Sequence, residues 1–380
     1  MRIGIYTLPL RTNFGGILQA WALQTVLRRM GHNVTTFAPY PYKHLAWWRK
    51  PLVYTKRIVS NICGNNVPIH YEKKFNTEYD IKTQYLRPFI ESNIRIRKYK
   101  NIKEIQSANY DVLIAGSDQI WRPKYNNCYG LTIENAFFEF AQDWNVKRLA
   151  YAVSFGTDEW EFTPEQTARC SKLATFFNSI SVRETSGVIM CQEKLGVKAT
   201  HVLDPTMLLT SDDYINLIQN SARTSAPSGN LLCYILDETK DTKKLIHHIE
   251  ISKNLIPFRA NSKINDPKAN IIEKIQPSVE QWLRDFFEAE FVVTDSFHAC
   301  VFSIIFNKPF VVIANKERGI SRYESLLSEL NLSDHLIFSS SDFDPSKDYE
   351  VTPDTFEKLH SMRKDSLQFL KSNLSLQKCN

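Results

Sequence analysis

The residues best suited to chemistry lie late in the chain, where one histidine is followed by a group of cations. Residues 291–322 predict a buried strand end, a turn at 294–296, a helix at 297–306, a second buried strand and a basic loop. His298 then lies in the first helical turn beyond a strand's carboxyl end, where parallel α/β sheets bind ligands and helix amides favour anions. Three cations follow the second strand and can approach the same crevice: Lys316, Arg318 and Arg322. The pattern predicts a site for a small, highly anionic substrate.

His298 has two interpretations. The first is structural, because a lone histidine near a helix start is more often a cap or a satisfied polar residue than a catalyst. The second is chemical, because an imidazole titrates near neutral pH and suits proton transfer. We expect His298 to act as a general acid or base, with Ser296 and the cations binding the anion. Cys300 lies two residues further on, and this spacing places it on another helix face, which favours a packed residue over a nucleophile.

Length and composition predict a two-domain cytoplasmic protein. The 380 residues suffice for two cores, and 43% hydrophobic and 23% charged residues are typical of soluble globular proteins. We find no apolar window long enough for a transmembrane helix, and the first residues predict a strand and a turn, not a signal peptide. The seven cysteines form no CxxC pair, and no His/Asp/Glu cluster has metal-ligand spacing, so we expect neither a metal nor a resident cofactor.

A basic segment, residues 42–105, concentrates the positive charge. It contains 14 Lys and Arg against 5 Asp and Glu. Trp47-Trp48-Arg49-Lys50 near its start suits the edge of an anionic bilayer, so one prediction is peripheral membrane contact. Nucleic acid is disfavoured, since no helix-turn-helix, RNP or zinc-finger signature is present. The alternatives are a solvated basic insertion or an oligomer contact.

The order of predicted elements indicates an α/β fold made of two Rossmann-like, doubly wound domains. A strand, a helix at 17–30 and a strand at 33–37 open the chain, and strands and helices alternate again after the basic segment. A second alternation begins at residue 231. We expect an N-terminal domain at 1–205, a C-terminal domain at 206–352, and a helix at 353–380 that packs back on the first domain. Two such halves with a cleft between them have the organisation of the glycosyltransferase-B type.

Six segments in this order resemble the polysaccharide pyruvyl transferase family. The resemblance covers most of the chain and is weakest in the basic segment. The segments are Asn13-Phe14-Gly15-Gly16-Ile17-Leu18-Gln19, Ala115-Gly116-Ser117-Asp118-Gln119-Ile120-Trp121, Tyr151-Ala152-Val153-Ser154-Phe155-Gly156, Ser181-Val182-Arg183-Glu184-Thr185-Ser186-Gly187, Asp204-Pro205-Thr206 and residues 294–322.

The resemblance implies transfer of pyruvate from phosphoenolpyruvate onto two hydroxyls of one sugar, which forms a cyclic ketal and releases phosphate. Arg183 matches the family's arginine in the Ser-Val-Arg-Glu motif, and we expect it to take part in catalysis and donor binding opposite Lys316 and Arg318. Several cations suit a donor that carries both a carboxylate and a phosphate. The acceptor implied is an envelope or capsular glycan precursor, expected on polyprenyl diphosphate at the inner face of the cytoplasmic membrane.

Two first-domain motifs are the expected acceptor site. Asn13, Gly15, Gly16 and Gln19 follow a strand and open a helix, where glycines allow close backbone approach. The second motif follows a buried strand and offers a carboxylate, an amide and an aromatic face to sugar hydroxyls; its residues are Ser117, Asp118, Gln119 and Trp121. A tight turn with Trp121 in the core is the alternative. Asp204 is expected to satisfy backbone amides at the interdomain turn.

Two other functions compete with pyruvyl transfer. A nucleotide-sugar glycosyltransferase of the same fold would need a base and ribose pocket in the second domain, where we identify no carboxylate for the ribose. A non-catalytic carbohydrate-binding or membrane-associated protein would not need the histidine and cation set.

Overall fold

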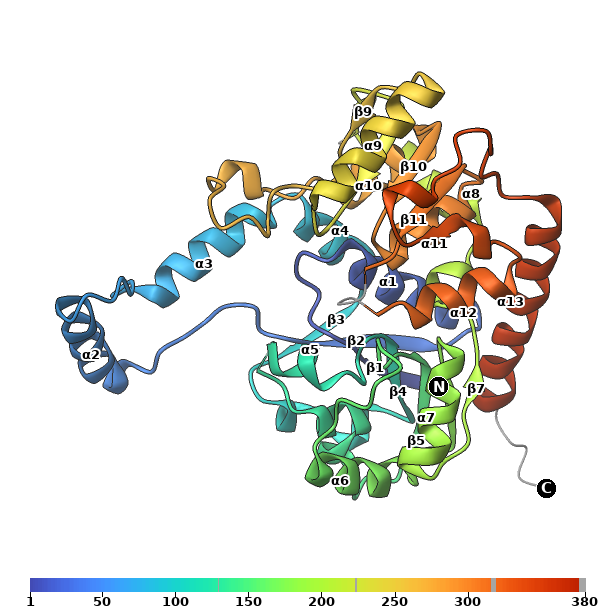
Figure 1. Ribbon diagram of the computed structural model, residues 1–380. Coiled ribbons are helices and arrows are strands. Elements are labelled where there is room, and N and C mark those ends of the chain that lie inside the picture. Colours follow the sequence, from blue (N-terminus) through green and yellow to red (C-terminus); the bar gives the residue numbers. More distant parts are fainter. Residues whose placement is uncertain (129, 223, 316–318, 376–380) are drawn as a thin grey trace, which may run out of the picture.

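The computed structural model describes all residues of the chain except 129, 223, 316–318 and 376–380, and it contains two parallel β-sheets (Figure 1). The first sheet has the order β3-β2-β1-β4-β5-β6-β7. Its strands are β1 (Arg2–Tyr6), β2 (Asn33–Pro39), β3 (Ile96–Tyr99), β4 (Val112–Asp118), β5 (Lys147–Val153), β6 (Ser179–Val182) and β7 (Thr200–His201). The second sheet has the order β12-β11-β10-β8-β9. Its strands are β8 (Leu231–Tyr234), β9 (Pro257–Phe258), β10 (Phe291–Thr294), β11 (Phe310–Ile313) and β12 (Leu336–Ile337).

Helices cover both sheets, as parallel strands require, because such strands are apolar on both faces. β4, β8, β10 and β11 are buried along their whole length. The helices are α1 (Phe14–Arg29), α2 (Lys50–Ile62), α3 (Tyr71–Lys82), α4 (Leu86–Asn93), α5 (Pro123–Cys128), α6 (Pro164–Ala174), α7 (Thr185–Leu195), α8 (Ser211–Gln219), α9 (Lys240–Lys253), α10 (Val279–Glu288), α11 (Phe297–Ile305), α12 (Ser321–Glu329) and α13 (Pro353–Leu374). None of the helices in the described part of the chain is both long and apolar enough to cross a membrane.

Both sheets have a topological switch point, where the order of the strands reverses direction. In the first sheet β1 lies between β2 and β4, which is the Rossmann order. In the second sheet β8 lies between β9 and β10, which is the flavodoxin-like order. Ligands of open α/β sheets bind beyond the carboxyl ends of strands at such points. The predicted fold class is confirmed: two Rossmann-like, doubly wound domains face each other across a cleft.

Apolar contacts join the two domains next to the cleft. The ring of Phe14, at the start of α1, stacks on Trp282 of α10 with centroids 5.3 Å apart. Tyr214 of α8 lies between Trp21 of α1 and Phe302 of α11, with centroid distances of 5.5 and 4.9 Å. One continuous hydrophobic core therefore includes helices of both domains.

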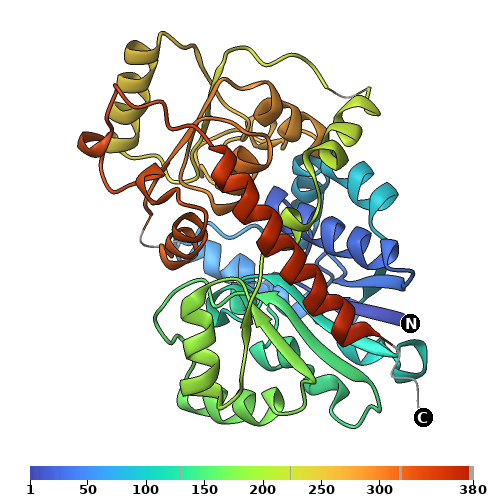
Figure 2. The same cartoon turned by 90° about the vertical axis from the view of Figure 1, so that its right-hand side faces the viewer.

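The last helix, α13, runs from the second domain along the side of the first (Figure 2). Its Ser366 hydroxyl accepts a hydrogen bond from the Leu203 amide, and Arg363 donates to the Met207 carbonyl. Near its end, Asn373 accepts a hydrogen bond from Ser179 at the start of β6. The helix thus links the domains on the face away from the projecting α2.

The basic segment 42–105 is divided between two structural roles. α2 and the outer end of α3 project away from the body of the molecule (Figure 1). By contrast, Leu86 and Phe89 of α4 lie in the core, and β3 pairs with β2 at the edge of the first sheet. The expectation of a single insertion was therefore wrong for the second half. The charged residues Arg97 and Lys98 made β3 difficult to predict from the sequence. They are compatible with a strand because an edge strand can expose charged side chains that a central strand would bury.

Candidate active site

A pocket lies between the two switch points and takes its walls from both domains. The first domain contributes Asn13, Gly16, Asp118 and Gln119, from the ends of β1 and β4. The second domain contributes Ser296 and His298, beyond the end of β10, together with Arg322 of α12. Seven residues predicted from distant parts of the sequence thus line one pocket.

His298 faces a buried carboxylate across this cleft. It lies in the first turn of α11, and only 7% of the residue is exposed. Its Nε2 atom is 3.7 Å from Oδ2 of Asp204, which is beyond hydrogen-bond length, and has no hydrogen-bond partner among the described residues. The imidazole therefore lies at the pocket wall, with its Nε2 atom on the side of the Asp204 carboxylate.

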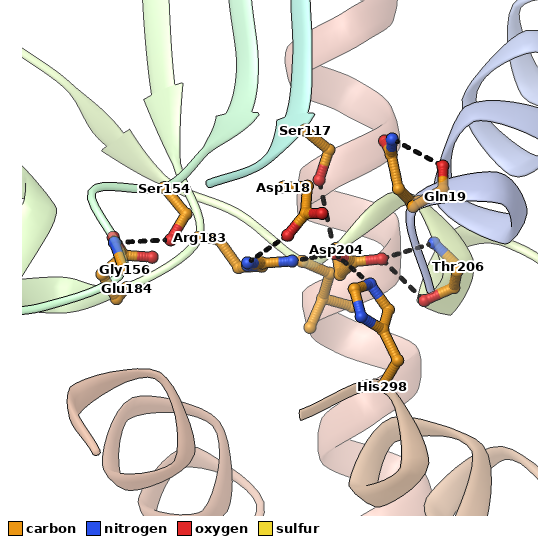
Figure 3. Close-up of polar contacts among 12 residues, drawn as sticks. Gln19, Ser117, Asp118, Ser154, Gly156, Arg183, Glu184, Asp204, Thr206 and His298 are labelled. Carbon is orange, nitrogen blue, oxygen red and sulfur yellow. Dashed lines mark hydrogen bonds and ion pairs between the residues drawn. The ribbon is translucent and has the colours of Figure 1, made fainter. Parts of the chain in front are cut away.

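Asp204 is the centre of a hydrogen-bond network beneath the pocket (Figure 3). Its Oδ1 accepts from the amide of Thr206 at 3.0 Å and from the Thr206 hydroxyl at 2.7 Å. Its Oδ2 accepts from Ser117 at 3.3 Å and from Arg183 at 2.6 Å. Burial alone would raise the pKa of Asp204, but His298, Arg183 and Thr206 together hold that pKa well below its usual range. Asp204 is thus a permanent buried anion opposite the imidazole.

Arg183 supports the site from behind and does not line the pocket. Its side chain is 2% exposed, and its two terminal nitrogens contact Asp204 at 2.6 Å and Asp118 at 3.4 Å. Burial tends to lower the pKa of Arg183, but the two carboxylates outweigh this effect and raise it. The expectation that Arg183 binds the donor directly is therefore corrected, because both ends of its guanidinium already hold buried carboxylates.

Asp118 brings a carboxylate to the pocket in a strained conformation. It ends β4 with a φ of 64°, in the left-handed region that non-glycine residues seldom adopt. Oδ1 is directed to Arg183, while Oδ2 lies on the side of Gly16. Such strain often accumulates at functional sites, where the surrounding structure over-determines it.

Two helix N-termini meet at the pocket and favour an anion there. α1 begins after Asn13 and α11 after Ser296, and neither residue makes a side-chain capping hydrogen bond within the described part of the chain. The first-turn amides and the positive end of each helix dipole therefore remain available to a ligand. Arg322 adds a guanidinium that is only 4% exposed, and burial together with Arg183 lowers its pKa.

Glycines let the two domains approach closely around His298. A Cβ atom at Gly15 would lie 2.0 Å from Nδ1 of His298, so no larger residue fits there without moving the ring. At a second contact between the domains, a Cβ at Gly319 would lie 1.7 Å from the carbonyl oxygen of Gly156. Gly319 has a φ of +85° and Gly156 a φ of +78°. Both contacts link the first domain to the second.

A model of the polysaccharide pyruvyl transferase family matches residues 13–317, from the loop before α1 to beyond β11. The chain belongs to the polysaccharide pyruvyl transferase family. The match includes every motif that lines the pocket up to residue 317. A search of curated proteins found no match.

Several solved structures are similar to this family member at very low identity. UGT89C1 of Arabidopsis thaliana, solved with UDP, is 8% identical with a TM-score of 0.48, and the match covers 98% of this chain and 99% of that one. The glycotransferase of kitacinnamycin is 11% identical with a TM-score of 0.44, covering 98% and 99%. MurG of Acinetobacter baumannii is 10% identical with a TM-score of 0.38, covering 97% and 94%. Similarity this low carries no information about substrates.

Three residues expected to contact the acceptor are instead buried. Trp121 is fully buried; its indole donates to the Ala136 carbonyl and stacks on Phe137 with centroids 4.3 Å apart. Ser117 is fully buried, and its hydroxyl is directed to Asp204. Gln19 is 1% exposed and donates to Thr7 and to the Gly16 carbonyl. The acceptor role is corrected for all three, because their side chains pack inside the first domain.

Of the four other motif residues named from the sequence, the structure describes Cys300 and Gln119. Cys300 is fully buried, and burial raises the pKa of its thiol well above the ordinary value, which agrees with a packing role. Lys316 and Arg318 lie outside the described residues. Gln119 lines the pocket, but its side-chain oxygen accepts a hydrogen bond from Arg122 at 2.9 Å. Among the described residues, no group of three or more His, Cys, Asp or Glu side chains is placed to hold a metal ion.

Asp204 makes more contacts than its sequence pattern predicts, and Glu184 and Asp295 have structural roles that no motif indicated. Asp204 does accept a backbone amide, as expected, but it also contacts Arg183, Ser117 and His298. Glu184 is fully buried and accepts hydrogen bonds from the amides of residues 155 and 156, which hold the loop after β5. Asp295 joins the ends of β8 and β10 by accepting the amides of residues 236 and 237. Their position in the sequence could have indicated these roles, because each of the three carboxylates lies within three residues after the carboxyl end of a strand.

Proposed function

We propose that this family member transfers pyruvate from phosphoenolpyruvate onto two hydroxyls of one sugar, forming a cyclic ketal and releasing phosphate. The observation that carries the proposal is the buried pair of His298 and Asp204, which lies where two helix N-termini and Arg322 favour an anion. A proton carrier beside an anion site suits an enol phosphate, which must gain a proton on carbon and lose phosphate.

The donor is proposed to bind between the two helix N-termini. Phosphoenolpyruvate presents a carboxylate and a phosphate. The first-turn amides of α1 and of α11 can each donate hydrogen bonds to one of these groups. Arg322 and Ser296 line the same pocket and supply a charged and a neutral donor. We propose Lys316 and Arg318 as further ligands, because they follow β11 in the sequence.

The proposed chemistry begins with proton transfer from His298 to the methylene carbon of phosphoenolpyruvate, which places positive charge on C2. A sugar hydroxyl adds to C2, and its proton restores His298. The C2–O bond to phosphate then breaks, a second hydroxyl closes the ketal, and its proton leaves with the phosphate as hydrogenphosphate. Asp204 supplies the counter-charge for the protonated imidazole and orients its ring.

The acceptor is proposed to approach from the side of the first domain. Asn13, Asp118 and Gln119 line that wall and offer amide and carboxylate groups to sugar hydroxyls. Asp118 is suited to receive a hydroxyl hydrogen bond through Oδ2, since Oδ1 is directed to Arg183. We propose an envelope or capsular glycan precursor on polyprenyl diphosphate, at the inner face of the cytoplasmic membrane, as the acceptor class.

The test is to incubate the protein with phosphoenolpyruvate and candidate glycan acceptors while phosphate release and acceptor mass are followed. His298→Ala is expected to lower turnover about 10²–10⁴-fold, the usual loss for a general acid or base. His247→Ala is the matched control, because that side chain is 70% exposed on α9, and it should keep wild-type turnover.

Other outcomes would overturn the proposal. Retention of more than about half of wild-type turnover by His298→Ala would remove this residue from the mechanism. Release of a nucleoside diphosphate from a nucleotide sugar, with no turnover of phosphoenolpyruvate, would assign the chain to glycosyl transfer. Acceptor binding without turnover of either donor would indicate a carbohydrate-binding protein.

A further inference from the structure

A helical arm, residues 42–76, projects from the first domain and consists of the turn at Trp47–Arg49, α2 and the start of α3 (Figure 1). Its two helices are tied together on their inner sides. Arg57 forms an ion pair with Glu72 at 2.6 Å, and Asn61 exchanges two hydrogen bonds with the backbone of Val67. The arm is therefore a folded hairpin with a defined outer face.

The outer face of α2 is apolar and open to solvent. Leu52, Val59 and Ile62 are 77%, 52% and 79% exposed, and their spacing of seven and three residues places them on one side of the helix. Trp47 and Trp48, just before α2, are 81% and 66% exposed. None of the residues of α2, all of which the structure describes, is buried. Adjacent exposed apolar side chains of this size mark an interaction surface.

The arm is also strongly basic. Residues 42–76 contain seven Lys and Arg against one Glu, a balance of +6, which equals the net charge of the full chain. That glutamate, Glu72, is neutralised by Arg57, which holds its pKa at about 2. Arg49 and Lys50 lie at the start of α2, and Lys56 lies in its middle. The partner surface must therefore accept apolar side chains and carry negative charge.

We propose that the arm docks on an anionic lipid bilayer, with the outer face of α2 in the interface and the flanking cations on the headgroups. A helix that lies in a bilayer interface has an apolar face bordered by Lys and Arg, and tryptophans prefer the headgroup level. Each cation near an anionic surface adds to the attraction, whereas a second copy of this +6 arm would repel it. Charge complementarity thus selects the bilayer over self-association through the arm.

The base of the arm leads toward the candidate active site. Tyr42, Arg87 and Lys98 line a second pocket there, and Pro9 contributes to both this pocket and the site pocket. A bilayer-bound acceptor could therefore extend from the arm past Pro9 to His298. This extension rests on the proposed function, whereas docking itself is independent of the reaction.

The experiment is co-sedimentation of the full chain with vesicles of phosphatidylglycerol and phosphatidylcholine, without donor or acceptor. We expect binding at low salt that weakens as salt rises, because the Debye length falls from about 10 Å at 0.1 M to about 3 Å at 1 M. Replacing Leu52, Val59 and Ile62 by Ser should reduce binding at least tenfold. Replacing the Trp47-Trp48-Arg49-Lys50 run by Ser should do the same.

The matched control replaces three exposed apolar residues of the second domain, Ile251, Ile272 and Phe338, by Ser, and it should bind as the wild type does. Equal sedimentation of the wild type and both arm variants would overturn the proposal. So would an absence of binding to the anionic vesicles at low salt. Self-association in the absence of vesicles that both arm variants abolish would assign the surface to a second copy. If the protein proves to have no pyruvyl transfer activity, the sedimentation result still stands, because the vesicles contain neither donor nor acceptor.

Discussion

The ring of His298 lies against the backbone of Gly15, although the two residues belong to different domains. A Cβ atom at position 15 would be 2.0 Å from Nδ1 and 2.3 Å from Cγ of the imidazole. Glycine at the start of α1 thus creates the space that the histidine occupies. On its other side the ring faces Asp204, 3.7 Å from Nε2. The position of the proposed proton carrier therefore depends on how closely the two domains approach.

Gly15→Ala is expected to displace His298 and lower turnover at least tenfold. The added methyl group would overlap the ring, and misplacement of a catalytic group by about 1 Å can cost 10²-fold. Gly16→Ala tests the specificity of this effect, because a Cβ there would meet Asn13 at an ordinary 3.5 Å. Phosphate release and the thermal midpoint would be measured for both. Equal turnover of Gly15→Ala and the wild type would show that the ring position is not critical.

Arg183→Ala is expected to destabilise the fold by about 3–5 kcal/mol, the usual result when one partner of a buried ion pair is removed. The change would leave Asp204, whose side chain has no exposed surface, without its 2.6 Å contact. Urea denaturation measures the loss. In the double variant Arg183→Ala/Asp204→Asn, the loss should be smaller than the sum of the losses in Arg183→Ala and Asp204→Asn. If Arg183→Ala is as stable as the wild type and only binds the donor more weakly, the result would support the direct contact with the donor that was predicted from the sequence.

Gly319→Ala is expected to separate the domains locally and to reduce both stability and turnover. Its Cβ would lie 1.7 Å from the Gly156 carbonyl oxygen, which is backbone and cannot rotate away. Gly31→Ala is the matched control, since Gly31 has the same φ of +85° but no atom within 4 Å of a Cβ. The control should lose only about 1–2 kcal/mol for the left-handed conformation and keep its turnover. If the two variants behave identically in denaturation and phosphate release, the close approach of Gly319 to Gly156 does not matter for stability or turnover.

Asp285→Asn is expected to stabilise the protein at pH 7.5 by about 1–3 kcal/mol. Burial raises the pKa of Asp285 to about 6, from an ordinary value of 3.8, despite a hydrogen bond from Gln281 at 2.8 Å. Because the unfolded chain ionises at lower pH than the folded one, the carboxyl group costs stability as pH rises from about 4 to 6. The gain from Asn should therefore shrink as pH falls toward 4. Urea denaturation of the wild type and Asp285→Asn at pH 4.5 and 7.5 tests this pH dependence. An equal gain in unfolding free energy at both pH values would show that ionisation of Asp285 is not the cause.

The sequence by itself determined the features that depend on local pattern. Apolar runs and helical spacing predicted the alternating elements of both domains and placed His298 in the first turn of a helix beyond a strand end, as observed. Strand ends predicted which polar residues gather, because carboxyl ends of parallel strands meet at one edge of a sheet. Asn13, Asp118, Ser296 and Arg322 accordingly line one pocket.

Only the tertiary structure decided which of these side chains reach the pocket and which are buried in contacts with other parts of the protein. Arg183 contacts carboxylates 65 and 21 residues away, and Trp121 donates to a carbonyl in a separate turn. β3 joins the first sheet although its own residues are mostly charged or exposed, because β2 supplies a free edge. Burial, ion pairing and the pairing of edge strands depend on residues from distant segments of the chain. A local sequence pattern therefore cannot predict them. The contact of Gly15 with His298 is of the same kind, since it exists only where the two domains meet.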